Sequence, residues 1–325
     1  MEDSAFSRPG KRPRRRATAA SRTDHDAKEK SSLHVKNMLR EIFSDSQAKI
    51  IVFSGSGMSV SAGFPTFSGD LYAKAAKTYK LKDGSKVFCY NFLESNPQEC
   101  FRFFKDLYMK TSKAKPTPSH RAHKAMEDSG KLIRHYTLNF DNLAYASGMS
   151  LWSCNDNKDD TSSSGMTVEL HGNINQLVCR RCGSVHRTNK AMKPIPKCQV
   201  KDCNGDLRFR VLLYDDKEAF LISKTNPLVH LLPKDVVECN AILWVGISFR
   251  QSASCQHFGM VLSALRATAA SKSHNKQVPM FLISPNSKHS LENLVDGLQI
   301  QLGESDGVYT VESKSDEFFE EFVVT

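Results

Sequence analysis

No run of about 18 uncharged apolar residues occurs in the 325-residue sequence, so it predicts no membrane-spanning helix. Residues 1–16 are polar and basic and lack the apolar segment of a secretory signal, so we expect none. With 40% hydrophobic and 25% charged residues, the composition excludes a mostly disordered or collagen-like chain. The length fits one large domain with a small insert and a tail.

Two common nucleotide-binding fingerprints are also missing. Residues 49–53 form a continuous β-branched run typical of a strand buried on both faces, and a glycine-rich segment follows at 54–63. Its third glycine comes only at Gly63, which rules out G-x-G-x-x-G, and no Gly-Lys-Ser/Thr follows, which rules out a P-loop. Gly55 and Gly57 still allow backbone N–H groups to approach a pyrophosphate, although a structural turn explains the spacing equally well.

The nine cysteines do not indicate a disulfide framework, because their number is odd and no export signal precedes them. Four of them form two close pairs, which are separated by fifteen residues. Two such pairs can surround Zn²⁺ with four thiolates at about 2.3 Å, and no position is then left for water. The sequence therefore predicts one structural zinc ion held by Cys179, Cys182, Cys198 and Cys203.

Residues 1–32 are poor in apolar side chains and are predicted to be a disordered basic tail. Within it, residues 8–16 hold six arginines and lysines and no acid. Such a run is typical of a nuclear-import signal or a nucleic-acid contact, and it also occurs in tails that only keep a protein in solution. We expect a nuclear protein, with the cytoplasm as the alternative, and no membrane partner.

Strands and helices alternate over the rest of the chain. Helical patterns occur at 35–43, 97–109, 119–126 and 256–267, and strands are predicted at 49–53, 132–137, 167–170, 241–245 and 280–283. This order predicts an α/β fold with an open parallel sheet covered by helices on both faces. The cysteine segment lies between two of the strands as an insert.

Polar side chains follow two of the predicted strands. Asn139 and Asp141 come after the strand at 132–137, and His171 comes after the strand at 167–170. Ligands collect at the carboxyl ends of strands in open α/β sheets, so these side chains could bind a ligand, and His171 could accept a proton from a hydroxyl group. Taken singly, each is more simply explained as a residue that caps a turn.

In this order, the motifs resemble those of the sirtuin family of NAD-dependent protein deacylases. The family pattern runs from G-A-G-x-S-x-x-x-G-I-P-D-F-R through T-Q-N-I-D and H-G to two cysteine pairs, G-T-S and a late V-x-I-N. The chain has corresponding segments at 55–68, 137–141, 171–172, 179–203, 246–248 and 281–284. The resemblance covers the chain from about residue 35 to the C-terminus.

This resemblance implies a sirtuin-type catalytic domain over 33–325: a large Rossmann-like lobe with a zinc-ribbon insert at about 174–210. NAD and an acylated lysine of a protein substrate would bind between the lobes. The acyl oxygen would attack C1′ of the nicotinamide ribose, nicotinamide would leave, and O-acyl-ADP-ribose and free lysine would form. His171, as base, Asn139 and Asp141 are the implied catalytic residues. The implied NAD-binding residues are Gly55, Ser56, Gly57, Ser59, Phe67, Asn139, Asp141, Gly246, Ser248 and Ser284.

The chain departs from the family pattern at several NAD-binding positions. Thr66 and Ser68 replace the Asp and Arg of P-D-F-R, and Ser284 replaces the late Asn. Leu138 replaces the Gln of T-Q-N-I-D and cannot hydrogen-bond a ribose. These changes predict slow, altered or absent turnover.

A further departure follows the ribbon. There the family has R-P-x-V-V-x-F-G-E, which pairs with the substrate as an added strand, and residues 207–216 stand in its place. Asp215 takes the position of the glycine, and Asp215 and Asp216 could attract a basic substrate tail.

Three functions remain open from the sequence. The first is an NAD-dependent deacylase of protein lysines, with histones as candidate substrates because of the basic tail. The second is a module that binds NAD or ADP-ribose with little or no turnover, and the third is a protein ADP-ribosyltransferase. A dehydrogenase is not expected, because residues 74–82, about 20 positions after the glycine-rich turn, carry no acid to hold a ribose.

Overall fold

The computed structural model of the chain describes residues 19–64, 70–153, 165–271 and 277–323. Its main element is a six-stranded sheet in the order β3-β2-β1-β7-β8-β9, and every neighbouring pair is parallel. The predicted open parallel sheet is confirmed. The strands are β1 (Ile50–Ser54), β2 (Leu132–Thr137), β3 (Thr167–Glu169), β7 (Ala241–Val245), β8 (Met280–Ser284) and β9 (Val308–Glu312).

Helices cover both faces of this sheet, because alternate side chains of the central strands are apolar in both directions. In β1, Ile51 and Phe53 pack with the helices of one face, and Ile50 and Val52 pack with those of the other. The first face is covered by α7 (Pro227–Glu238), α8 (Ser252–Ser271) and α9 (Ser287–Leu298). The second is covered by α1 (Ala19–Ser44), α5 (Pro118–Asp128) and α10 (Ser315–Phe322).

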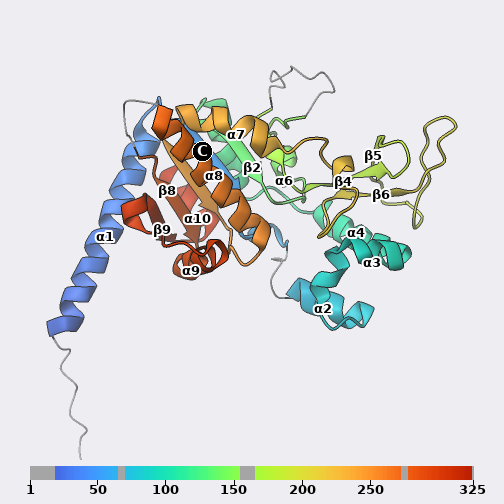
Figure 1. Cartoon of the computed structure of the whole chain (residues 1–325), viewed down its shortest axis with the longest axis horizontal. Helices are drawn as coiled ribbons and strands as arrows, with labels where there is room; N and C mark the ends of the chain where they lie inside the picture. The colour runs from blue at the N-terminus through green and yellow to red at the C-terminus, as the bar shows by residue number, and fades with distance from the viewer. Residues whose placement is uncertain (1–18, 65–69, 154–164, 272–276, 324–325) are drawn as a thin grey trace, which may run out of the picture.

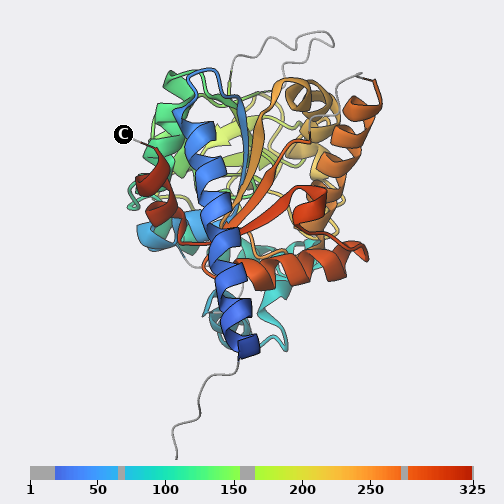
Figure 2. The ribbon, with the colours of Figure 1, turned by 90° about the vertical axis from the view of Figure 1, so that its left-hand side faces the viewer.

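Helix α1 is longer than its apolar pattern predicts. Val35, Leu39 and Phe43 are buried as expected, but the helix already begins at Ala19, inside the segment predicted to be disordered. Residues 19–32 contain neither proline nor glycine, so a helix that is stabilised by packing further along can propagate through them. Figures 1 and 2 show the N-terminal part of α1 extending beyond the sheet. The basic run at 8–16 lies outside the described residues.

A second lobe combines two separate stretches of the chain (Figure 1). One is an antiparallel ribbon of β4 (Gly172–Cys179), β5 (Val185–Arg187) and β6 (Leu207–Val211), in the order β5-β4-β6. The other contains α2 (Asp70–Tyr79), α3 (Tyr90–Ser95) and α4 (Pro97–Thr111). The two stretches share one hydrophobic core.

The helix predicted at 97–109 is present as α4, but it does not cover the parallel sheet. It packs on the ribbon, where the ring centroids of Phe101 and Phe104 lie 5.1 and 5.9 Å from that of Phe209. Periodicity shows which face of a helix is apolar and not which partner covers that face. Among the described helices, including the short α6 (Leu143–Ala146), none combines the length and apolar character that crossing a bilayer requires.

Candidate active site

An open cleft of about 1910 Å³, solvent at its mouth included, lies where β1, β2, β3 and β7 end. Its walls come from both lobes, since Tyr72, Phe88 and residues 212–215 of the second lobe face the segments that follow the sheet strands. Such a position, at the carboxyl ends of parallel strands, is where α/β proteins bind ligands. The predicted site residues that line the cleft are Gly55, Ser56, Asn139, His171, Gly246 and Ser248.

The glycines of the first turn pack against the turn that follows β7. The N–H groups of Gly55 and Gly57 donate to the carbonyl oxygens of Val245 and Gly246, at 2.9 and 3.0 Å. A side chain at Gly57 would place its Cβ 2.6 Å from the Cα of Gly246, so only glycine fits there. These two N–H groups are therefore bonded within the protein, and the close packing positions Ser56 in the cleft wall.

Ser59, Asn139 and Asp141 form one buried hydrogen-bond network beside the cleft. The Ser59 hydroxyl donates to Asp141 Oδ2 at 2.6 Å, and Asn139 Nδ2 donates to the Gly55 carbonyl at 3.0 Å and to Ser59 Oγ at 3.2 Å. Asp141 Oδ1 accepts from the Leu143 N–H. Ser59 and Asp141 thus support the wall, whereas Asn139 Oδ1 is buried and has no hydrogen-bond partner among the described residues.

His171 is held in one tautomer by the backbone. Its Nδ1 lies 2.9 Å from the Leu138 carbonyl oxygen, which can only accept, so Nδ1 carries the hydrogen and Nε2 is the basic nitrogen. Burial lowers the pKa of His171 below 6.5, and the bond to the Leu138 carbonyl acts in the opposite direction. The ring is therefore neutral at pH 7 and can accept a proton.

A second histidine, His257 on α8, lies next to His171, with ring centroids 6.2 Å apart. Burial and the neighbouring His171 lower the pKa of His257 to about 4. Its Nδ1 is buried and has no partner among the described residues. Sequence reasoning missed this residue, because it lies inside a helical pattern without a motif, and only the packing of α8 brings it next to His171.

The structure places the other predicted NAD-binding residues as follows. Gly246 adopts a left-handed conformation with φ = 63°, and Ser248 is exposed, with its carbonyl bonded to Asn293. Ser284 is buried at the end of β8, where its hydroxyl lies 3.0 Å from that of Ser290, and it is not among the residues that line the cleft. Phe67, Thr66 and Ser68 lie outside the described residues.

The loop after β6 forms one wall of the cleft. Asp215 lines the cleft with φ = 53°, a left-handed conformation that favours the glycine of the family pattern. Asp216, in contrast, is buried in an ion pair with Arg208 at 2.6 Å, and its carboxylate also accepts the Leu213 N–H. The prediction that Asp216 attracts a substrate tail is therefore wrong, because its charge is neutralised inside the protein.

Backbone groups of this wall are already paired. The Leu212 N–H donates to the His171 carbonyl at 3.0 Å. Tyr214 donates to the Phe88 carbonyl and accepts from the Tyr90 N–H, at 2.8 and 2.9 Å. A substrate strand added here would have to pair through other backbone groups.

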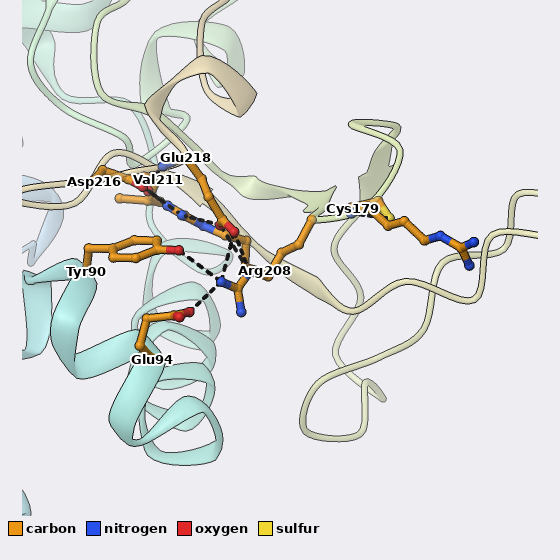
Figure 3. Close-up of polar contacts among 9 residues, drawn as sticks. Tyr90, Glu94, Cys179, Arg208, Val211, Asp216 and Glu218 are labelled. Carbon is orange, nitrogen blue, oxygen red and sulfur yellow. Dashed lines mark hydrogen bonds and ion pairs between the residues drawn. The ribbon is translucent and has the colours of Figure 1, made fainter.

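Charged residues join this wall to the ribbon and to α3. Arg208 pairs with both Asp216 and Glu218, and Glu218 also pairs with Arg180, which directly follows the zinc-ligand candidate Cys179. Arg180 in turn donates to the Tyr90 hydroxyl of α3 and pairs with Glu94. Figure 3 shows Tyr90 and Glu94 of α3 facing Arg208 and Glu218.

The four predicted zinc ligands lie together at the far end of the ribbon. All four Sγ atoms are within 4.8 Å of one another, with Cys179 and Cys203 at 3.5 Å and Cys182 and Cys198 at 3.7 Å. A tetrahedral ion with bonds of about 2.3 Å needs sulfurs about 3.8 Å apart. The cluster therefore fits one structural Zn²⁺, and Cys182 is its exposed member.

Comparison with known proteins supports one family. The Sir2 family model matches residues 55–252. NAD-dependent deacetylase sir2D of Dictyostelium discoideum is 30% identical over 172 residues, covering 51% of this chain and 29% of that protein. NAD-dependent deacetylase sir2C of the same organism is 26% identical over 240 residues, covering 69% and 48%. The chain thus spans less than half the length of these relatives.

Solved structures share the fold. A Sir2 homologue crystallised as a complex with NAD superposes with a TM-score of 0.61 at 17% identity, covering 88% of this chain and 91% of the other. A Sir2 point mutant bound to a p53 peptide and NAD gives 0.58 at 16% identity, covering 90% and 96%. Together with the family match over more than half of the sequence, the fold and the clustered cysteines show that the chain belongs to the Sir2 family.

Proposed function

We propose that the chain is an NAD-dependent protein deacylase that transfers the acyl group of a lysine to ADP-ribose and releases nicotinamide. The observation that carries this proposal is His171, which lines the cleft with its Nδ1 fixed by the Leu138 carbonyl and Nε2 left as a base. The relatives named as NAD-dependent deacetylases support the same reaction.

The cleft offers polar groups that suit NAD. Asn139 Oδ1 is buried without a partner among the described residues, so it offers an acceptor to an amide N–H such as that of nicotinamide. Ser56, Gly246 and Ser248 line the same cleft and would hold the rest of the dinucleotide. Bound NAD supplies the ribose carbon that receives the acyl oxygen, and nicotinamide is the leaving group.

His171 supplies the general base in this proposal. Its low pKa keeps Nε2 unprotonated at pH 7, so it can take a proton from a ribose hydroxyl. Leu138, Phe88 and Ile247 add apolar side chains to the cleft wall.

The experiment measures nicotinamide release from NAD with and without an acetyl-lysine peptide. We expect release that depends on the peptide, and a loss of about 100-fold or more in His171→Ala, because general bases contribute that much or more. His289→Ala serves as the matched control, since His289 is an exposed histidine on α9. Equal rates for the native protein and His171→Ala would show that this chain is not an enzyme of this type.

Leu138 favours a second candidate, a module that binds NAD or ADP-ribose with little turnover. Its apolar side chain lines the cleft where the family pattern has glutamine, so one contact to the ribose is missing. Calorimetry that shows tight ADP-ribose binding without nicotinamide release would support this candidate. Label from NAD appearing on protein would instead support an ADP-ribosyltransferase.

A nuclear location and a histone substrate are further parts of the proposal, and they rest on the basic run at 8–16. The test compares the location of a fluorescent fusion with that of a variant in which the six basic residues of the run are alanine. Nuclear accumulation that is lost in the variant is expected. Equal distribution of the two proteins would remove this part of the proposal.

A further inference from the structure

Two polar side chains of the ribbon, one in β5 and one in the residue just before it, face the cysteine cluster. Residues 184 and 186 lie on the same side of an extended segment, and Val185 between them is exposed. Ser184 and His186 are therefore directed to the cluster by strand alternation. Neither belongs to a motif identified in the sequence.

Ser184 contacts two of the four sulfurs. Its Oγ lies 3.1 Å from Cys182 Sγ and 3.2 Å from Cys198 Sγ. His186 Nε2 lies 2.9 Å from Ser184 Oγ and 3.4 Å from Cys198 Sγ. The two side chains thus form a hydrogen-bonded pair along the Cys182–Cys198 edge of the cluster.

This edge is where the cluster is open to solvent. Cys182 is exposed, whereas the other three cysteines are buried. The buried Cys179 Sγ accepts from the backbone N–H groups of Arg181 and Cys182, both at 3.4 Å. Cys182 and Cys198, in contrast, are contacted by the side chains of Ser184 and His186. A substitution can remove these side-chain contacts, whereas it leaves the backbone contacts to Cys179 in place.

Four thiolates around Zn²⁺ carry a net charge of −2, and hydrogen bonds to the sulfurs stabilise that charge. A serine hydroxyl has one hydrogen to donate, and the imidazole N–H can donate to the serine oxygen. Together they form a chain from His186 Nε2–H to Ser184 Oγ, and from the Ser184 hydroxyl to Cys182 or Cys198.

We propose that hydrogen bonds from Ser184 and His186 stabilise Cys182 and Cys198 as zinc ligands at the exposed edge of the site. These bonds thereby set the rate at which zinc leaves the protein. This role rests on the zinc site and is independent of the proposed catalysis. Hydrogen-bond partners of metal ligands typically change metal affinity by about 10- to 100-fold.

The experiment follows zinc release from the full chain to a colorimetric chelator, 4-(2-pyridylazo)resorcinol. Ser184→Ala and His186→Phe are expected to release zinc about 10-fold faster than the native protein. Val185→Ala is the matched control, because it alters the same strand on the opposite side and should leave the rate unchanged. His186→Gln, which keeps a side-chain N–H donor, should restore most of the native rate.

Cobalt substitution separates this role from direct metal binding by His186. With four sulfur ligands, the Co²⁺ absorption bands of the native protein and His186→Phe should coincide. A loss of these bands in His186→Phe, or release rates in Ser184→Ala and His186→Phe that match the native rate, would overturn the proposal. If His186→Phe does not fold, Ser184→Ala decides, and release from Ser184→Ala at the rate of Val185→Ala would overturn the proposal.

Discussion

Leu138 has separate roles for its backbone and its side chain. Its N–H donates to the Ser54 carbonyl, and its own carbonyl accepts from His171, so the backbone fixes both the end of β2 and the tautomer of the base. Its side chain is buried and lines the cleft. A substitution at this position therefore alters ligand contacts while the backbone hydrogen bonds are kept.

We predict that Leu138→Gln lowers the KM for NAD. A side-chain amide can supply a hydrogen bond to ribose worth about 1 kcal/mol, which corresponds to about a five-fold change. The same change should lower the melting temperature slightly, because Leu138 also belongs to a hydrophobic core. Nicotinamide-release kinetics measure the effect, with Leu138→Met as the control for packing. A KM equal to that of Leu138→Met would contradict the prediction.

At the scale of elements, the ion pairs around Arg208 tie the cleft wall to the ribbon and to α3. Arg208 and Asp216 are both almost fully buried, at 3% and 1% side-chain exposure. Arg208 also donates to the Val211 carbonyl at the end of β6. One guanidinium group thus holds the loop that carries Tyr214 and Asp215 into the cleft.

We predict that Arg208→Met destabilises the protein by about 3–5 kcal/mol, because it leaves the Asp216 carboxylate buried and unpaired. Urea unfolding measures this loss. The double variant Arg208→Met/Asp216→Leu should recover much of it, because no isolated charge then remains. Equal stability of the single and double variants would show that the charge is not what matters.

The four-cysteine cluster contributes to the stability of the ribbon through the metal that it binds. We predict that Cys179→Ser loses zinc and unfolds the ribbon, because metal binding supplies part of the folding free energy of such small elements. Metal content and a melting curve measure this, with Cys89→Ser as the control, since Cys89 lies outside the cluster. Unchanged metal content in Cys179→Ser would disprove the four-thiolate site.

At the scale of the whole molecule, several histidines are buried in the neutral form. His123 on α5 and His135 on β2 stack face to face, with ring centroids 4.7 Å apart. Burial lowers the pKa of His135 to about 3, and it lowers the pKa of His123 well below 6.5. The pKa values of His171, which lines the cleft, and of the neighbouring His257 are also lowered.

We therefore predict that stability falls as the pH decreases from 6.5. The unfolded chain takes up protons near pH 6.5, whereas these buried rings do not, so each contributes a loss of about 1.4 kcal/mol per pH unit down to its folded pKa. Urea unfolding at pH 7, 6 and 5 measures the slope. His135→Gln should reduce this slope.

Glu169 acts in the opposite direction. Burial raises its pKa to about 8, so its contribution is fully present below pH 4.5 and is lost as the pH rises through 8. Stability is thus expected to be highest near pH 6.5, because above this pH the histidine contribution no longer rises while the Glu169 contribution is still being lost. Glu169→Gln should remove this loss, and, because the loss already begins above pH 4.5, it should also make the fall in stability between pH 6.5 and 5 steeper.

The sequence by itself determined the features that depend on local pattern. The strands at 132–137 and 241–245 and the helix at 119–126 follow from the spacing of apolar residues, which a few neighbouring residues set. The cysteine cluster follows from two short spacings in the same way. His171 at a strand end follows from the order of motifs along the chain.

Only the tertiary structure decided which polar groups are hydrogen-bonded or ion-paired inside the protein and which face the cleft. The N–H groups of Gly55 and Gly57 are bonded to the turn after β7, Asp216 is paired with Arg208, and His257 lies beside His171. Each of these contacts joins segments whose meeting depends on how the two lobes and the sheet pack. Local periodicity carries no information about such partners, because it reports only which face of an element is buried.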